Sequence, residues 1–169
     1  TGDRTMTSII KVDQIQTLAG AAPTAADLGI NVTGSVLQVV NATSTTSTQV
    51  NASTTWTTFA GSIAITPTAS TSKVLIMHNA GGMVYSTTNA IGFRLLRNGT
   101  VIITHPRYGY KDGGVDWSPV PFTMIYLDSP ATTSAVTYTF QVYSDVANGQ
   151  WRHNDQGGTA TSIAQEISG

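Results

Sequence analysis

The densest group of side chains that could take part in recognition chemistry lies between His105 and Ser118, in the sequence HPRYGYKDGGVDWS. Aromatic rings stack on the faces of sugars, and Arg and Asp side chains hydrogen-bond to hydroxyl groups, so this composition suits the binding of a glycan or a protein. We therefore predict a recognition loop here, made by His105, Arg107, Tyr108, Tyr110, Asp112, Asp116 and Trp117. A second aromatic and polar patch, containing Trp151 and Arg152, could join it. The alternative is that these rings only anchor a long loop or lie between subunits.

Catalytic signatures are missing from the sequence. The three histidines, His78, His105 and His153, are far apart and show none of the close spacings that are typical of metal sites. The chain has no Gly-x-Ser-x-Gly nucleophile motif, no P-loop and no dinucleotide fingerprint. A calcium site on Asp112 and Asp116 would have too few other oxygen ligands. We expect no catalytic, cofactor-binding or metal-ligating residues, and hence no enzyme and no cofactor.

A glycosidase would need two carboxylic acids at a defined separation. Several of the candidates stand in turn-forming sequences such as Lys111 to Gly114, where Asp is common for reasons of backbone geometry. The available side chains are Asp112, Asp116, Asp128, Asp145, Asp155 and Glu166.

The composition excludes several other classes. The 169 residues contain no cysteine, which removes disulfides, thiolate metal sites and cysteine nucleophiles together. Only 10% of the residues are charged and the net charge is −1, without a basic stripe, so we expect no binding to nucleic acid. No apolar run approaches the roughly 20 residues of a membrane helix, so we expect no membrane insertion.

The clearest structural element that could position these residues is a hairpin between Ile91 and His105. Asn98-Gly99 stands between two apolar runs, and this dipeptide favours the positive φ angles that a two-residue type I′ turn requires. The β-branched residues Val101, Ile102 and Ile103 follow the turn, as expected for a strand. We predict a β-hairpin that leads directly into the aromatic stretch.

The rest of the chain reads as short strands separated by turn residues. In the clearest example, Val136, Tyr138, Phe140 and Val142 alternate with polar residues and should face a core. About ten short strands without a convincing long helix predict an all-β fold, an antiparallel jelly-roll sandwich. The predicted strands lie near 36–40, 56–59, 62–67, 74–77, 83–85, the hairpin 91–105, 119–127, 137–143, 150–153 and 161–167.

Two of these strands are apolar on both faces, namely 74–77 and 124–127. One face of a strand in an isolated sandwich would be wet, so a second copy of the chain is the economical way to cover it. The alternative is that loops or the N-terminal segment of the same chain cover it. We predict a subunit interface formed by Val74, Ile76, Ile125 and Leu127.

The sequence divides into three parts. Residues 1–5 precede Met6 and are interpreted as a leader or a cloning remnant. Residues 6–33 contain one extended apolar stretch and a weak helix start, and we predict that this segment attaches to another protein; the alternative is a disordered tail. Residues 34–169 form the predicted jelly-roll domain.

An ordered set of pieces over residues 6–168 resembles the small virion structural and fibre-tip proteins of tailed, marine-type bacteriophages. These pieces are SIIKVDQIQ, TAADLGINVTGSVLQVV, SIAITPTASTSKVLIM, FRLLRNGTVI, YLDSPATTSAVTYTFQV and TSIAQEIS. Such domains are similar to the jelly roll of C1q and tumour necrosis factor, a ten-strand sandwich that forms trimers. Each piece alone is a generic β-pattern, and no family active site can be placed on this chain.

The resemblance implies a non-enzymatic protein on the exterior of the virion, with itself as a partner in a homotrimer. It would attach to other virion proteins through residues 6–33 and, as a knob or fibre tip, bind a glycan or protein of the host surface. A capsid decoration protein is the competing role. Because the chain lacks the repetitive shaft of full tail fibres, a compact appendage is favoured. The alternatives are a free lectin-like or C1q-like binding module and, less favoured, a carbohydrate-active enzyme.

Overall fold

The computed structural model describes residues 33–51, 54–145, 150–154 and 157–169. This part of the chain consists of β-strands and turns. The strands are β1 (Val36–Ser44), β2 (Thr48–Asn51), β3 (Thr57–Ile65), β4 (Lys73–Ala80), β5 (Gly82–Arg97), β6 (Thr100–Pro119), β7 (Phe122–Asp128), β8 (Val136–Ser144), β9 (Gln150–His153) and β10 (Ala160–Ile167). The described residues contain no helix long and apolar enough to cross a membrane.

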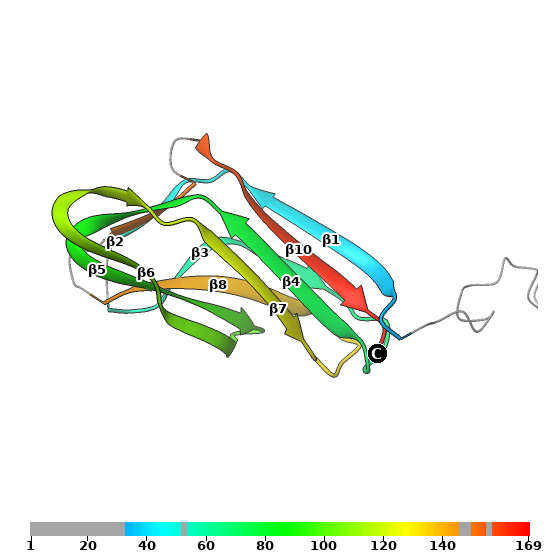
Figure 1. Cartoon of the computed structure of the whole chain (residues 1–169). Coiled ribbons are helices and arrows are strands. Elements are labelled where there is room, and N and C mark those ends of the chain that lie inside the picture. Colours follow the sequence, from blue (N-terminus) through cyan, green and yellow to red (C-terminus); the bar gives the residue numbers. More distant parts are fainter. Residues whose placement is uncertain (1–32, 52–53, 146–149, 155–156) are drawn as a thin grey trace, which may run out of the picture. The chain divides into compact units, whose positions relative to one another are not determined.

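The strands form two antiparallel sheets that pack face to face (Figure 1). The first sheet has the order β1-β10-β4-β7. The second has the order β2-β9-β5-β8-β3, with β6 along the other edge of β5. Without the short strands β2 and β9, the remaining eight strands can be numbered 1 to 8 along the chain. The first sheet then has the order 1-8-3-6, and the second sheet has the order 2-7-4-5. This is the double Greek-key order of a jelly roll. The predicted antiparallel jelly-roll sandwich is confirmed.

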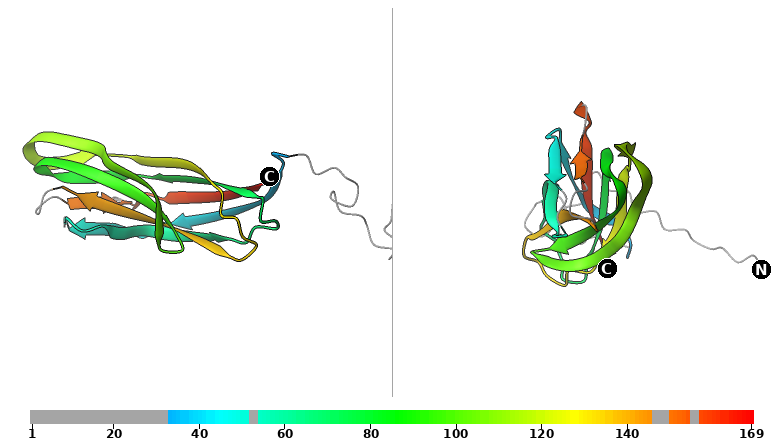
Figure 2. Two further views of the ribbon diagram at one scale, coloured as in Figure 1. Left: turned by 90° about the horizontal axis from the view of Figure 1, so that it is seen from below. Right: turned by 90° about the vertical axis from the view of Figure 1, so that its left-hand side faces the viewer.

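The predicted hairpin is present and is longer than expected. Asn98 (φ 48°) and Gly99 (φ 81°) both take positive φ, as a type I′ turn requires. Asn98 also accepts a hydrogen bond from the backbone N–H of Thr137 at 2.8 Å, which ties the turn to β8. From the turn, pairing between β5 and β6 continues to Met83 and Pro119, and Figure 2 shows this hairpin curving at one end of the sandwich.

The prediction of a loop over 105–118 is wrong, because this segment belongs to strand β6. β6 has more residues than β5 at two places, opposite Ile91–Phe93 and opposite Ser86–Thr88, and the extra residues form bulges there. Gly113 and Gly114, both with positive φ, lie within the second bulge. The Pro and Gly residues that resemble a loop in the sequence therefore bend the strand without ending its pairing.

The core lies between the inner faces of the two sheets and is rich in aromatic residues. The predicted inward side chains of β8, from Val136 to Val142, are all buried, which confirms the alternation. Their largest neighbours within the core are Phe59, Phe93, Phe122 and Trp151.

Two strand assignments differ from expectation. Strand β3 joins the segments predicted as separate strands at 56–59 and 62–67, and β2 was not predicted from the sequence.

Candidate recognition and assembly surfaces

The outer face of the first sheet carries an apolar band that solvent reaches. Side chains alternate along each strand, so every second residue of β4, β7 and β10 points away from the core. Ile163, Met77 and Ile125 lie side by side in the sheet register, and Leu75 lies opposite Leu127. The exposed fraction is 66% for Ile125 and 49% for Leu127. We refer to these five residues, Leu75, Met77, Ile125, Leu127 and Ile163, as the apolar face.

The predicted interface residues are only partly placed on this surface. Ile125 and Leu127 are exposed, and their role as interface residues stays a prediction. The assignment of Val74 and Ile76 is wrong, because both side chains are completely buried in the core of their own chain. Their neighbours Leu75 and Met77 are the residues of β4 that point outward. An open hollow of about 210 Å³, lined in part by Met77, Ile125 and Ile163, lies on the same face.

Tyr108 serves the structure of β6. Its hydroxyl donates to the carbonyl of Thr123 and accepts from the N–H of the same residue, both at 3.1 Å. Its ring packs edge-on against Phe93 and Phe122, with centroids 5.2 and 5.3 Å away. Tyr108 thus links β6 to β7.

The other predicted recognition residues fall into separate environments. His105 and Tyr110 are exposed on β6, and Arg107 forms an exposed ion pair with Asp145 at 3.5 Å. Trp151 was predicted as a recognition residue and this is wrong, because its ring is buried to 1% exposure between the sheets. The side chain of Asp112 lies outside the described part of the structure.

Two of the predicted recognition residues do come together. The guanidinium of Arg152 lies over the ring of Trp117, with Cζ 4.2 Å from the ring centroid. Tyr85 stands opposite Trp117 in the β5–β6 pairing, and the two ring centroids are 5.1 Å apart. The carboxylate of Asp116 accepts from the backbone N–H of Trp117 at 2.7 Å. The result is a partly exposed cluster of Tyr85, Trp117 and Arg152 on the outer face of the second sheet. Sequence reasoning missed Tyr85, because its place depends on the register of a hairpin longer than predicted.

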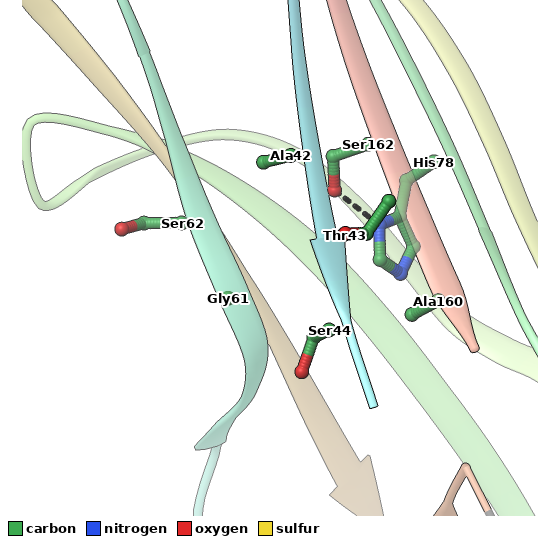
Figure 3. Close-up of a pocket in the computed structure, with 8 residues that line it drawn as sticks. All are labelled: Ala42, Thr43, Ser44, Gly61, Ser62, His78, Ala160 and Ser162. Carbon is green, nitrogen blue, oxygen red and sulfur yellow. Dashed lines mark hydrogen bonds between the residues drawn. The ribbon is translucent and has the colours of Figure 1, made fainter. Parts of the chain in front are cut away.

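Two of the three histidines converge inside the core. His78 Nδ1 is 2.8 Å from Ser162 Oγ, and Figure 3 shows this contact among the residues that line a small cavity. The small cavity there has a volume of about 60 Å³, against about 300–1,000 Å³ for typical ligand pockets. Burial, and then the nearby His153, lower the pKa of His78 to about 4. His78 Nε2 has no hydrogen-bond partner among the described residues, so no carboxylate orients the ring as in a serine hydrolase triad.

The buried carboxylates are engaged in structural contacts. Asp128 accepts from Arg97 at 3.0 Å and from the hydroxyl of Tyr138 at 2.7 Å. Glu166 is completely buried and accepts from Gln38 at 2.6 Å and from both the N–H and the hydroxyl of Thr68 at 2.7 Å. Burial alone would raise the pKa of Glu166, but hydrogen bonds from Gln38 and Thr68 lower it overall. Among the described residues, no group of three or more His, Asp or Glu side chains could hold a metal ion.

The fold and these surfaces define the chain as a jelly-roll β-sandwich with an apolar outer face on one sheet and an aromatic, cationic outer face on the other. No family model and no curated protein matches the chain.

Several solved structures share part of the architecture at low similarity. T=1 particles derived from infectious bursal virus match with 11% identity over 78% of this chain and 36% of that chain, with a TM-score of 0.39. The VP2 subviral particle of infectious bursal disease virus matches with 11% identity over 78% and 38%, with a TM-score of 0.35. The T13 particle of the same virus matches with 13% identity over 78% and 36%, with a TM-score of 0.37. The chain spans just over a third of the length of these matched chains.

Proposed function

We propose that this chain is a non-enzymatic structural protein of a bacteriophage virion, which assembles as a homotrimer through its apolar face and stands on the exterior of the particle. The observation that carries the proposal is the exposure of large aliphatic side chains on the outer face of the first sheet, led by Ile125. The sequence resemblance to phage fibre-tip and virion proteins supports the virion role and the trimer.

The apolar face has the composition of a subunit interface. The five side chains form a continuous strip over three neighbouring strands, and the nearest charged side chain on the outer face of β4 is Lys73 at its end. Burial of a large aliphatic side chain stabilises by roughly 1.5–3 kcal/mol, so a few such side chains per protomer would supply a substantial part of an association energy. A copy of the same chain presents the same surface, which makes self-association the economical way to cover it.

Recognition of a host glycan or protein is assigned to the opposite outer face. The cluster of Tyr85, Trp117 and Arg152 belongs to the second sheet, so association through the first sheet would leave it accessible. Stacked aromatic rings beside a guanidinium suit both sugars and polar protein surfaces. Attachment to other virion proteins is assigned to residues 6–33, which lie almost entirely outside the described residues.

A free lectin-like or C1q-like module would use the same two faces, and mass spectrometry of purified particles separates it from a virion protein. A stoichiometric amount of the chain in particles supports the virion role, and its absence from them contradicts it. A carbohydrate-active enzyme is less favoured, because Asp128 and Glu166 are both engaged in structural contacts.

The absence of cysteine allows a clean test of the interface. A single cysteine at Ile125 should react slowly with a maleimide when the chain is assembled. The matched control is Val101→Cys on β6, a position that is 42% exposed and lies in the other sheet, where labelling should be fast. Equally fast labelling at both positions, at a concentration where the chain is at its highest oligomeric state, would contradict the proposed interface.

A further inference from the structure

The outer face of the second sheet carries a half-buried positive charge without a counter-ion at Arg94. Burial lowers the pKa of this guanidinium. Arg97 and Arg107 form ion pairs with Asp128 and Asp145, but no carboxylate of the described residues lies within ion-pair distance of Arg94. A guanidinium that has no counter-ion in its own chain keeps its charge and its remaining donors for a partner outside the chain, and an anion suits both.

Arg94 is held in a fixed orientation. Its Nε donates to Gln141 Oε1 at 2.7 Å, and its Cζ lies 4.6 Å from the centroid of the Trp56 ring. Gln141 is positioned in turn, because its Nε2 donates to the hydroxyl of Thr58 at 3.2 Å. These contacts use one edge and one face of the guanidinium. The Nη1 and Nη2 groups have no hydrogen-bond partner among the described residues, and this pair of donors matches the two oxygens of a carboxylate.

An aromatic wall stands beside this guanidinium. Trp56 and Tyr143 stack with ring centroids 5.1 Å apart and an interplanar angle of 29°. Tyr143 is on β8 and Arg94 on β5, two strands that pair directly, while Trp56 immediately precedes β3 on the other side of β8. Both rings keep partial exposure on the outer face, away from the core. Arg94 and Tyr143 cover part of the Trp56 ring, so the apolar surface available to the C–H face of a sugar is the part of the two rings that stays exposed.

We propose that Arg94, Trp56 and Tyr143 form a binding site for a saccharide that carries a carboxylate group. The Nη1 and Nη2 groups of Arg94 bind the carboxylate, and the sugar ring packs against Trp56 and Tyr143. The site is separate from the cluster around Trp117, although both lie on the outer face of the second sheet. This proposal extends the recognition role proposed above. It depends on that proposal in one respect, which is that the outer face of the second sheet stays exposed in the assembled protein.

Binding of the full chain to two acidic probes, tri-galacturonic acid and sialyllactose, tests the proposal by titration calorimetry. Lactose and galactotriose are the neutral counterparts, and hexaglutamate and inorganic phosphate test for simple anion capture. We expect at least one acidic saccharide to bind at least tenfold more tightly than its neutral counterpart, hexaglutamate and phosphate. Failure of both acidic saccharides to bind, or equal binding of hexaglutamate or phosphate, would overturn the proposal.

Variants assign the binding to the site. Arg94→Gln and Trp56→Ala should each weaken binding at least tenfold, and Arg94→Lys should do so as well, since it keeps the charge and the aliphatic stem but loses the fork. Lys73→Gln removes one positive charge from the other sheet and should leave binding unchanged. A thermal melt of each variant verifies folding. Wild-type affinity in a folded Arg94→Lys variant would overturn the proposal, whereas the oligomeric state of the same samples reports separately on the proposed assembly.

Discussion

His78 and His153 approach each other across the core from opposite sheets, with ring centroids 6.4 Å apart and planes inclined by only 20°. Phe140 stacks on His78 at 4.0 Å, and Phe59 contacts both imidazoles. Among the described residues, the polar partner of His78 is the hydroxyl of Ser162, and no carboxylate contributes to the pKa of His78. A proton on either ring would place a charge in an aromatic core, and protons on both would add repulsion between them.

This pair should make the fold sensitive to acid. Below its ordinary pKa of 6.5, His78 of the unfolded chain takes up a proton, while in the folded chain it stays neutral until its pKa of about 4. The unfolded state therefore binds more protons in this window, and the free energy of unfolding falls as the pH drops from about 6.5 to about 4. For His78 alone the loss is about 3 kcal/mol, and His153, whose pKa burial also lowers, adds to it. Urea unfolding at pH 7.5 and pH 4.5 measures most of this difference.

The matched variants separate this pair from other acid effects. His105→Gln alters an exposed histidine and should leave the pH dependence as in wild type. The double change His78→Phe with Ser162→Ala removes the titrating ring and its hydroxyl partner together, and should clearly reduce the loss at pH 4.5. A double variant that loses as much stability in acid as the wild type would rule out His78 as the source.

Glu166 is the single glutamate of the chain, and it fixes Gln38 and Thr68 to the end of β10. Replacement by Gln removes the charge and puts an N–H₂ group where an acceptor is needed. We expect Glu166→Gln to lower the free energy of unfolding at pH 7 by about 1–3 kcal/mol, since a buried donor is left unpaired. Chemical denaturation gives the value, with Gln165→Glu, which adds a carboxylate on the outer side of the same strand, as control. An unchanged stability of Glu166→Gln would contradict this account.

Tyr108 was predicted to take part in recognition, but its contacts indicate a structural role, and a single substitution tests that role. Tyr108→Phe removes both hydrogen bonds to the backbone of Thr123 and keeps the ring contacts with Phe93 and Phe122. The expected cost is about 1–2 kcal/mol of stability, measured by denaturant titration. Tyr110→Phe, on an exposed ring of the same strand, is the control and should cost little. If Tyr108→Phe is as stable as wild type, its hydroxyl does not hold β6 to β7.

The elements that the sequence predicts well are those with one polar and one apolar face. Residues 136–144 alternate cleanly, so the inward set of β8 could be read directly. Asn98-Gly99 is equally explicit, because few dipeptides adopt positive φ at two consecutive positions.

The errors have physical causes in the same pattern. In β4 the run from Val74 to Met77 is apolar at every position, so the sequence does not indicate which side chains face the core. The outward residues Leu75 and Met77 were missed for this reason. In β6 the turn-forming residues lie in bulges, which only the pairing with a distant strand reveals. The sites around Arg152 and Arg94 combine side chains that are far apart in the sequence, so spacing alone could not bring them together.

The proposal that the apolar face is a subunit interface is tested most directly by the molar mass of the full chain in solution. Light scattering on the purified wild type should give three times 17.7 kDa, about 53 kDa, if the proposed trimer covers the exposed Ile125 and its neighbours. Ile125→Asp should give the monomer mass of 17.7 kDa with an unchanged circular dichroism spectrum, and Lys73→Gln should remain trimeric. A wild-type chain that stays at 17.7 kDa at high micromolar concentration, or an Ile125→Asp variant with the mass of the wild-type assembly, would contradict the account.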